Sequence, residues 1–299
     1  MPDLFRIVNI GDSVPWGQGL LEEEKYDFLI KQALLPRNPG GVSLQRFAHS
    51  GAIIGARPTL GNPAPGEVPV SRPTIIEQCD AFTDSPQTVD LVLVNGGIND
   101  VGVATILNPF TSGLPLHTEI QVACHDGMLM LLRKVSARFT KPSCRILVTG
   151  YYTIFSAKSN PLCLPLLMEL HGLAVPGFTA HLALVNPVVA RCEQFFTQSA
   201  SDIQVAIADA KDPRISFVGS GFTDVNAIFV PGTGFLWGLN ALLQPEDPVA
   251  NQRRPQCDQV FPNPLEIAPR EQCYRASAGH PNIAGARQYA GQILKALGH

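Results

Sequence analysis

The sequence predicts an α/β fold in which helices cover both faces of a parallel sheet. Apolar, β-branched runs alternate with longer amphipathic segments, and three of the runs stop at glycine-rich or polar turns. Such alternation is typical of parallel strands joined by crossover helices. The 299 residues contain no repeat, low-complexity tract or linker, so we expect residues 1–299 to form one domain.

Five runs are expected to form the strands. The three strong runs are apolar up to the turns GDS, NGGIND and TGYY, and two weaker runs lie within SLQRFAHSGA and ISFVG. In chain order the predicted strands cover residues 4–10, part of 43–52, 89–94, 145–148 and 215–219.

The segments between these runs have helical periodicity. The last is the clearest, because apolar residues recur at helical spacing after Pro281, which can occupy a first helical position. Asn186 followed by Pro187 is typical of a helix start. The predicted helices cover residues 21–35, 118–139, 188–210 and 281–297.

Two stretches do not fit the alternating core. Residues 59–73 are crowded with proline and glycine, and residues 222–275 form a long segment with little periodicity. Long loops are often functional, and ligands bind outside the carboxyl ends of parallel strands. We therefore expect both insertions to emerge beside the functional site.

Charge and composition exclude several classes of protein. Lysine and arginine number 22 against 25 aspartate and glutamate residues, a formal net charge of −3, so no nucleic-acid partner is expected. With 45% hydrophobic and 16% charged residues the chain can build a large core. No apolar run reaches the roughly 18 residues of a membrane span. The start passes directly into LFRIVNI, which predicts a cytoplasmic location, or secretion if a signal precedes this sequence. The sequence leaves the oligomeric state open.

The seven cysteines have no zinc-site spacing. Cys257 and Cys273 bracket a proline-rich, charged segment that a disulfide would restrain. The alternative is that both stay reduced, as cytosolic thiols do.

Four residues at turns are candidates for chemistry. Ser13 in GDS and Asn99 in NGGIND follow predicted strands, where a main-chain N–H or a neutral amide can donate to developing negative charge. Gly51 in HSGA is either a turn glycine or a further N–H donor. His280 in RASAGHPN suits a general base, so activity should fall below a pH of about 6.5. Each motif alone is equally typical of a simple turn.

In combination, GDSVPWGQGL, HSGA, GGIND and SAGHPN resemble the SGNH family of GDSL-type hydrolases. The blocks extend over residues 11–282 in a fixed order. The resemblance implies a flavodoxin-like three-layer α/β/α sandwich with a five-stranded parallel sheet. It also implies that Ser13 is the nucleophile, that His280 is the base, and that Ser13 N–H, Gly51 and Asn99 form the oxyanion hole.

The chain departs from the family at one position. The family places an aspartate three residues before the histidine, where this chain has Ser277. A main-chain carbonyl of Ser277 or Ala278 can hold the ring tautomer instead, as some members of the family are understood to do. The alternative is a carboxylate that folds back from further away, such as Asp258 or Glu271.

The resemblance implies a serine esterase or lipase that acts on a small or lipid-like acyl ester, without a metal or organic cofactor. An acyltransferase with the same site, a carbohydrate deacetylase and a non-catalytic binding module remain alternatives. Phe229, Phe235 and Trp237 lie amid glycines, a composition that suits an apolar wall over an acyl chain, and Trp16 is a further candidate for substrate binding. The alternative for the loop is a satellite core.

Overall fold

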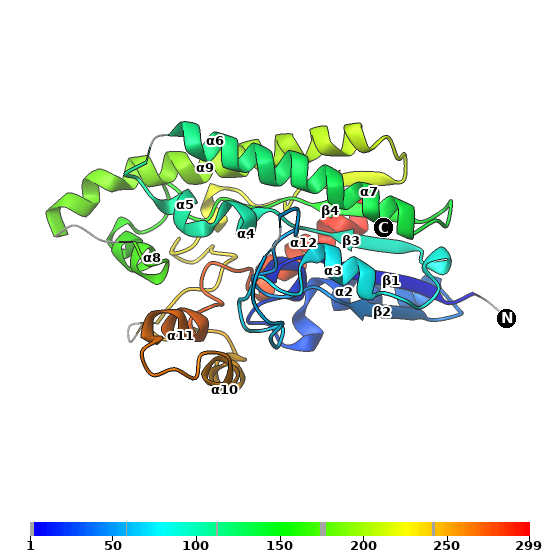
Figure 1. Cartoon of the computed structure of the whole chain (residues 1–299), viewed down its shortest axis with the longest axis horizontal. Coiled ribbons are helices and arrows are strands. Elements are labelled where there is room, and N and C mark those ends of the chain that lie inside the picture. The colour runs from blue at the N-terminus through cyan, green and yellow to red at the C-terminus, as the bar shows by residue number, and fades with distance from the viewer. Residues whose placement is uncertain (1–2, 58, 112, 174–177, 241–242) are drawn as a thin grey trace.

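The computed structural model describes residues 3–57, 59–111, 113–173, 178–240 and 243–299. Its centre is one parallel sheet of five strands in the order β2-β1-β3-β4-β5 (Figure 1). The strands are β1 (Phe5–Ile10), β2 (Val42–Arg46), β3 (Leu91–Val94), β4 (Arg145–Thr149) and β5 (Ile215–Val218). This sheet confirms the predicted fold class. Because the chain leaves β1 toward β2 on one side and later returns to β3 on the other, the strand order reverses between β1 and β3.

Helices pack on both faces, which explains the continuous apolar runs of the strands. All four residues of β3 are fully buried. On one face α2 (Tyr26–Leu34) packs against α12 (Ile283–Ala296). On the other, α7 (Met128–Arg138) packs against α3 (Ile75–Ala81) and α9 (Phe178–Ala210).

The remaining elements are short or lie outside these layers. The other helices are α1 (Ser13–Trp16), α4 (Ile98–Val101), α5 (Val103–Leu107), α6 (Gly113–Gln121), α8 (Leu164–Leu170), α10 (Ala250–Val260) and α11 (Ile267–Tyr274). A π-helical turn covers Val122–Gly127, and 3-10 turns cover Glu22–Glu24, Leu35–Arg37, Pro86–Thr88, Pro161–Cys163 and Asp224–Asn226. No helix among the described residues is long and apolar enough to cross a membrane.

All four predicted helix starts differ from those in the structure. The helices expected from 21 and 118 begin at Tyr26 and Gly113, and the other two differences have a local explanation. Helix α9 begins at Phe178 and passes through Pro187, although an interior proline costs about 3 kcal/mol. Val188 and Phe195 are fully buried and the helix packs against α6 and α7, which offsets that cost. Helix α12 begins at Ile283, because the Asn282 side chain caps it by accepting a hydrogen bond from the Ala284 N–H at 2.9 Å.

The segment 222–275 is more ordered than its weak periodicity indicates. Its second half folds into α10 and α11, which stand beside the carboxyl edge of the sheet (Figure 1). Cys257 and Cys273 form a disulfide between these two helices, with a Cα–Cα distance of 5.9 Å. Val68, from the other insertion, packs against the disulfide in a small separate core. The two insertions therefore support each other.

Candidate active site

Ser13 lies at the reversal point of the strand order, directly after β1. Gly11 makes the turn with a φ of 148°, and Asp12 caps α1 by accepting a hydrogen bond from the Val14 N–H at 2.9 Å. Ser13 is the first residue of α1, a position whose N–H has no acceptor within its own helix. Its side chain faces the cavity, and the residue is 4% exposed.

A buried hydrogen-bond chain that the sequence analysis missed fixes this turn. The Tyr151 hydroxyl donates to Asp12 Oδ2 at 2.7 Å and accepts from the Ile98 N–H at 3.1 Å. Burial raises the pKa of Asp12 to about 6. These hydrogen bonds connect the residues that follow β1, β3 and β4.

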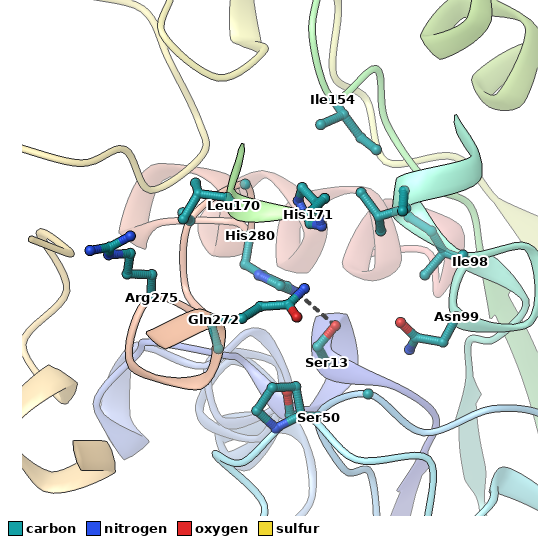
Figure 2. A pocket seen from close by; sticks show the side chains of 18 of the residues that line it. Ser13, Ser50, Ile98, Asn99, Ile154, Leu170, His171, Gln272, Arg275 and His280 are labelled. Carbon is teal, nitrogen blue, oxygen red and sulfur yellow. Dashed lines mark hydrogen bonds between the residues drawn. The ribbon is translucent and has the colours of Figure 1, made fainter. Parts of the chain in front are cut away.

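His280 reaches Ser13 from the far end of the chain. Its Nε2 lies 2.7 Å from Ser13 Oγ, as the dashed line in Figure 2 marks. The loop that carries His280 is held by main-chain hydrogen bonds, since the Trp237 N–H donates to the His280 carbonyl at 2.8 Å and the Gly279 N–H donates to the Trp237 carbonyl at 2.9 Å. Two residues predicted from separate motifs are thus brought into direct contact.

The surroundings of His280 favour its neutral form. Burial is the main cause that lowers the pKa of the ring to about 4, and His171 and Arg253 act in the same direction. The carbonyls of Ser277 and Ala276 oppose the shift. Nδ1 is buried without a well-formed hydrogen bond to any described residue. A neutral ring can accept a proton at Nε2.

This lowered pKa revises the pH dependence expected from the sequence. We expect an NMR titration of the His280 ring to show a midpoint near 4. The base then stays neutral, and this group keeps kcat/KM constant until the pH approaches that value. The signal is assigned by its loss in a His280→Gln variant. A midpoint at about 6.5, the ordinary value for histidine, would contradict the prediction.

Gly51 and Asn99 line the same cavity as Ser13. Gly51 has a φ of 76°, and a Cβ there would lie 2.6 Å from the Val70 nitrogen, so only glycine fits. Its N–H donates to no described residue. Asn99, in α4, donates through Nδ2 to the Ala52 carbonyl at 3.0 Å. The second hydrogen of that amide can donate to another acceptor.

Ser13, Gly51, Asn99 and His280 all line one cavity of about 430 Å³ (Figure 2). One part of its wall is apolar and consists of Ile98, Val103, Ile154, Leu167 and Leu170. Another part is polar and consists of His171, Gln272 and Arg275. Gln272 lies in α11 and Arg275 directly follows it, so the segment 222–275 contributes to the cavity wall.

The four aromatic residues predicted for substrate binding lie elsewhere. Trp16 donates to Glu67 at 2.8 Å and has Lys25 over its ring. Phe229, Phe235 and Trp237 are partly buried and pack against the main core. Since none of the four lines the cavity, the core interpretation of this loop fits better than the apolar-wall interpretation.

Ser277 occupies the position of the aspartate in the SGNH family, and it contacts the carboxylate of Asp247, which the motifs do not predict. The Ser277 hydroxyl donates to Asp247 Oδ2 at 2.5 Å. Asp258 instead accepts a hydrogen bond from Tyr274, and Glu271 pairs with Arg275 at 3.3 Å. Asp247 lies thirty residues before Ser277 in the sequence, so no motif connects the two residues. The described residues contain no group of side chains suited to hold a metal ion.

The fold and the cavity define a doubly wound α/β protein with a serine–histidine pair at the carboxyl edge of its sheet. No protein-family model matches the sequence. No curated protein matches it either.

Solved structures nevertheless share the fold. A phospholipase A1 from Streptomyces albidoflavus NA297 is 16% identical, with 98% of each chain covered and a TM-score of 0.53. The lipase Lip_vut3 from a goat rumen metagenome is 14% identical over 72% of this chain and 80% of that one, with a TM-score of 0.45. The aryl esterase of M. smegmatis is 16% identical over 77% and 90%, with a TM-score of 0.42. The phospholipase, with a TM-score above 0.5, shares the fold of this chain.

Proposed function

We propose that this protein is a serine esterase or lipase that hydrolyses carboxylic esters through an acyl-enzyme on Ser13. The observation that carries the proposal is the 2.7 Å contact between Ser13 Oγ and Nε2 of a neutral His280. This is the arrangement in which a hydroxyl is activated by an adjacent base. The motifs and the fold shared with a phospholipase A1 support the same reaction.

The reaction has two steps. Ser13 Oγ attacks the ester carbonyl carbon while its proton passes to His280 Nε2, and collapse of the tetrahedral adduct returns that proton to the departing alcohol. Water then attacks the acyl-enzyme, giving its proton to Nε2, and Ser13 leaves with a proton from the same nitrogen. His280 ends each turnover neutral, as it began.

The charge that develops on the carbonyl oxygen needs donors that are already in place. Ser13, Gly51 and Asn99 line the same cavity, and the Ser13 N–H, the Gly51 N–H and the second Asn99 amide hydrogen are the donors they can offer. Donors fixed before the reaction need no reorganisation in the transition state. We assign these three groups to the oxyanion hole.

The cavity also indicates the substrate class. Its apolar wall suits the acyl group, and a volume of about 430 Å³ suits a short to medium chain. The polar wall formed with α11 suits the alcohol. An ester panel of graded acyl length sizes the site, and added glycerol detects acyl transfer as a new ester product.

Covalent labelling tests the proposal directly. We expect a fluorophosphonate probe to add once to the wild-type protein, as measured by intact mass, and not to Ser13→Ala. Ser50→Ala is the matched control, because Ser50 lines the same cavity without contacting His280 Nε2. Folded wild-type protein that stays unlabelled, or a Ser13→Ala variant that still reacts, would refute the proposal.

A further inference from the structure

A buried aspartate that the reaction does not use lies behind His280. Asp247 precedes α10, and its side chain is fully buried. Arg253 donates to its two oxygens at 3.2 and 2.8 Å, and Arg253 also donates to Glu67 at 3.1 Å. A buried carboxylate held in this way has a fixed position, because releasing it would leave unpaired charges out of water.

The fixed carboxylate holds Ser277. Its Oδ2 accepts the Ser277 hydroxyl at 2.5 Å, and both residues are buried. A hydrogen bond to an ionised acceptor is roughly twice as strong as one between neutral groups. Gly19 lies close to both residues, since a Cβ there would come within 2.8 Å of Ser277 Cβ and 3.0 Å of Asp247 Cβ. Ser277 is therefore hydrogen-bonded to the insertion and packed against the loop that follows the nucleophile.

Ser277 in turn sets the loop of His280. Its carbonyl accepts the His280 N–H at 2.9 Å, and the same carbonyl opposes the lowering of the His280 pKa. Nδ1 of the ring is buried and without a well-formed partner. The position of Ser277 therefore bears on the position of the ring, whose Nε2 faces Ser13.

We propose that Asp247 is the positioning residue for His280 and acts through Ser277, in the place of an acid that contacts the ring directly. This inference rests on the proposed function, in which His280 is the base. Asp247 does not touch the ring. It fixes the turn that carries the Ser277 carbonyl, and this carbonyl favours the ring tautomer with hydrogen on Nδ1.

Two variants interrupt the link, the hydrogen bond from Ser277 to Asp247, at different atoms. Ser277→Ala removes the hydroxyl and keeps the pair of Asp247 with Arg253, whereas Asp247→Asn replaces the charged acceptor by a neutral one. We expect each to lower kcat about 10- to 100-fold with little change in KM, as loss of an orienting partner typically does. Asp212→Asn is the control, because it removes a carboxylate bound to Arg214 at the amino end of β5. A kcat like that of the wild type in Ser277→Ala would overturn the proposal.

The double variant tests whether the two residues act as one unit. We expect Asp247→Asn with Ser277→Ala to be no slower than the slower single variant, since groups in one chain of contacts are not additive. If instead the two losses multiply, Asp247 acts independently of Ser277 and the proposal fails. Thermal unfolding of all variants shows whether a loss of kcat reflects lost folding.

An NMR readout separates this inference from the proposed function. We expect the ring nitrogens of His280 to report hydrogen on Nδ1 in the wild type and a mixture of tautomers in both single variants. If the tautomer changes in both variants while no fluorophosphonate labels the wild-type protein, the link is supported and the esterase proposal fails. An unchanged tautomer in both variants would refute the link even in an active esterase.

Discussion

His280→Gln should lower the turnover of an ester substrate by about 10⁶-fold, the order that loss of the base costs serine proteases. The amide of glutamine fills a similar space but cannot take the proton of Ser13 Oγ. In the proposed reaction every proton passes through this ring, whose Nε2 lies 2.7 Å from that oxygen. The measurement is kcat for a short-chain ester, together with the rate of fluorophosphonate labelling.

The control for this variant is a histidine far from the cavity. His125 bonds to Asp126 at 2.7 Å and to Asp209 at 3.0 Å near the surface, so His125→Gln should leave kcat close to that of the wild type. His171→Gln is the informative neighbour, because His171 lines the same cavity. If His171→Gln abolished turnover and His280→Gln did not, the assignment of the base would be wrong.

The sequence predicts the central strands well because they are the most deeply buried, whereas the edge strands β2 and β5 are only partly buried and give weaker runs. β3 lies within the predicted run 89–94, and all its residues face helices, so hydrophobicity alone locates it. Helix ends are harder to predict, because they depend on tertiary packing. Pro187 is the example, since its local preference for a helix start is overridden by the contacts of α9.

Some residues of the candidate site could likewise be predicted from the sequence, and others could not. Ser13 and His280 could be found because four motifs in a fixed order resemble those of the SGNH family, and the structure brings the two residues together. Asp247 could not be found, since its role depends on a contact made only in the folded chain. The role of Phe235 stayed open, because an aromatic residue in a glycine-rich loop has the same composition whether it packs inward or lines a cavity.

Asn99→Ala should lower kcat by about 10²- to 10³-fold with little change in KM, as removal of one oxyanion-hole donor does. The amide is useful only when the carbonyl oxygen carries charge, so its loss falls on the transition state and spares ground-state binding. The measurement is kcat and KM for one ester, compared with those of the wild type.

A structural role of Asn99 makes a second variant necessary. Its amide also holds the Ala52 carbonyl, so Asn99→Ala releases the loop that carries Gly51. Asp100 provides the matched control, because it ties the same loop through the Ile54 N–H at 3.0 Å and does not line the main cavity. We expect Asp100→Ala to lower kcat less than about tenfold, since it loosens the loop and keeps all three donors. Equal losses in the two variants would mean that Asn99 acts through the loop, and the oxyanion hole would then consist of the two main-chain N–H groups.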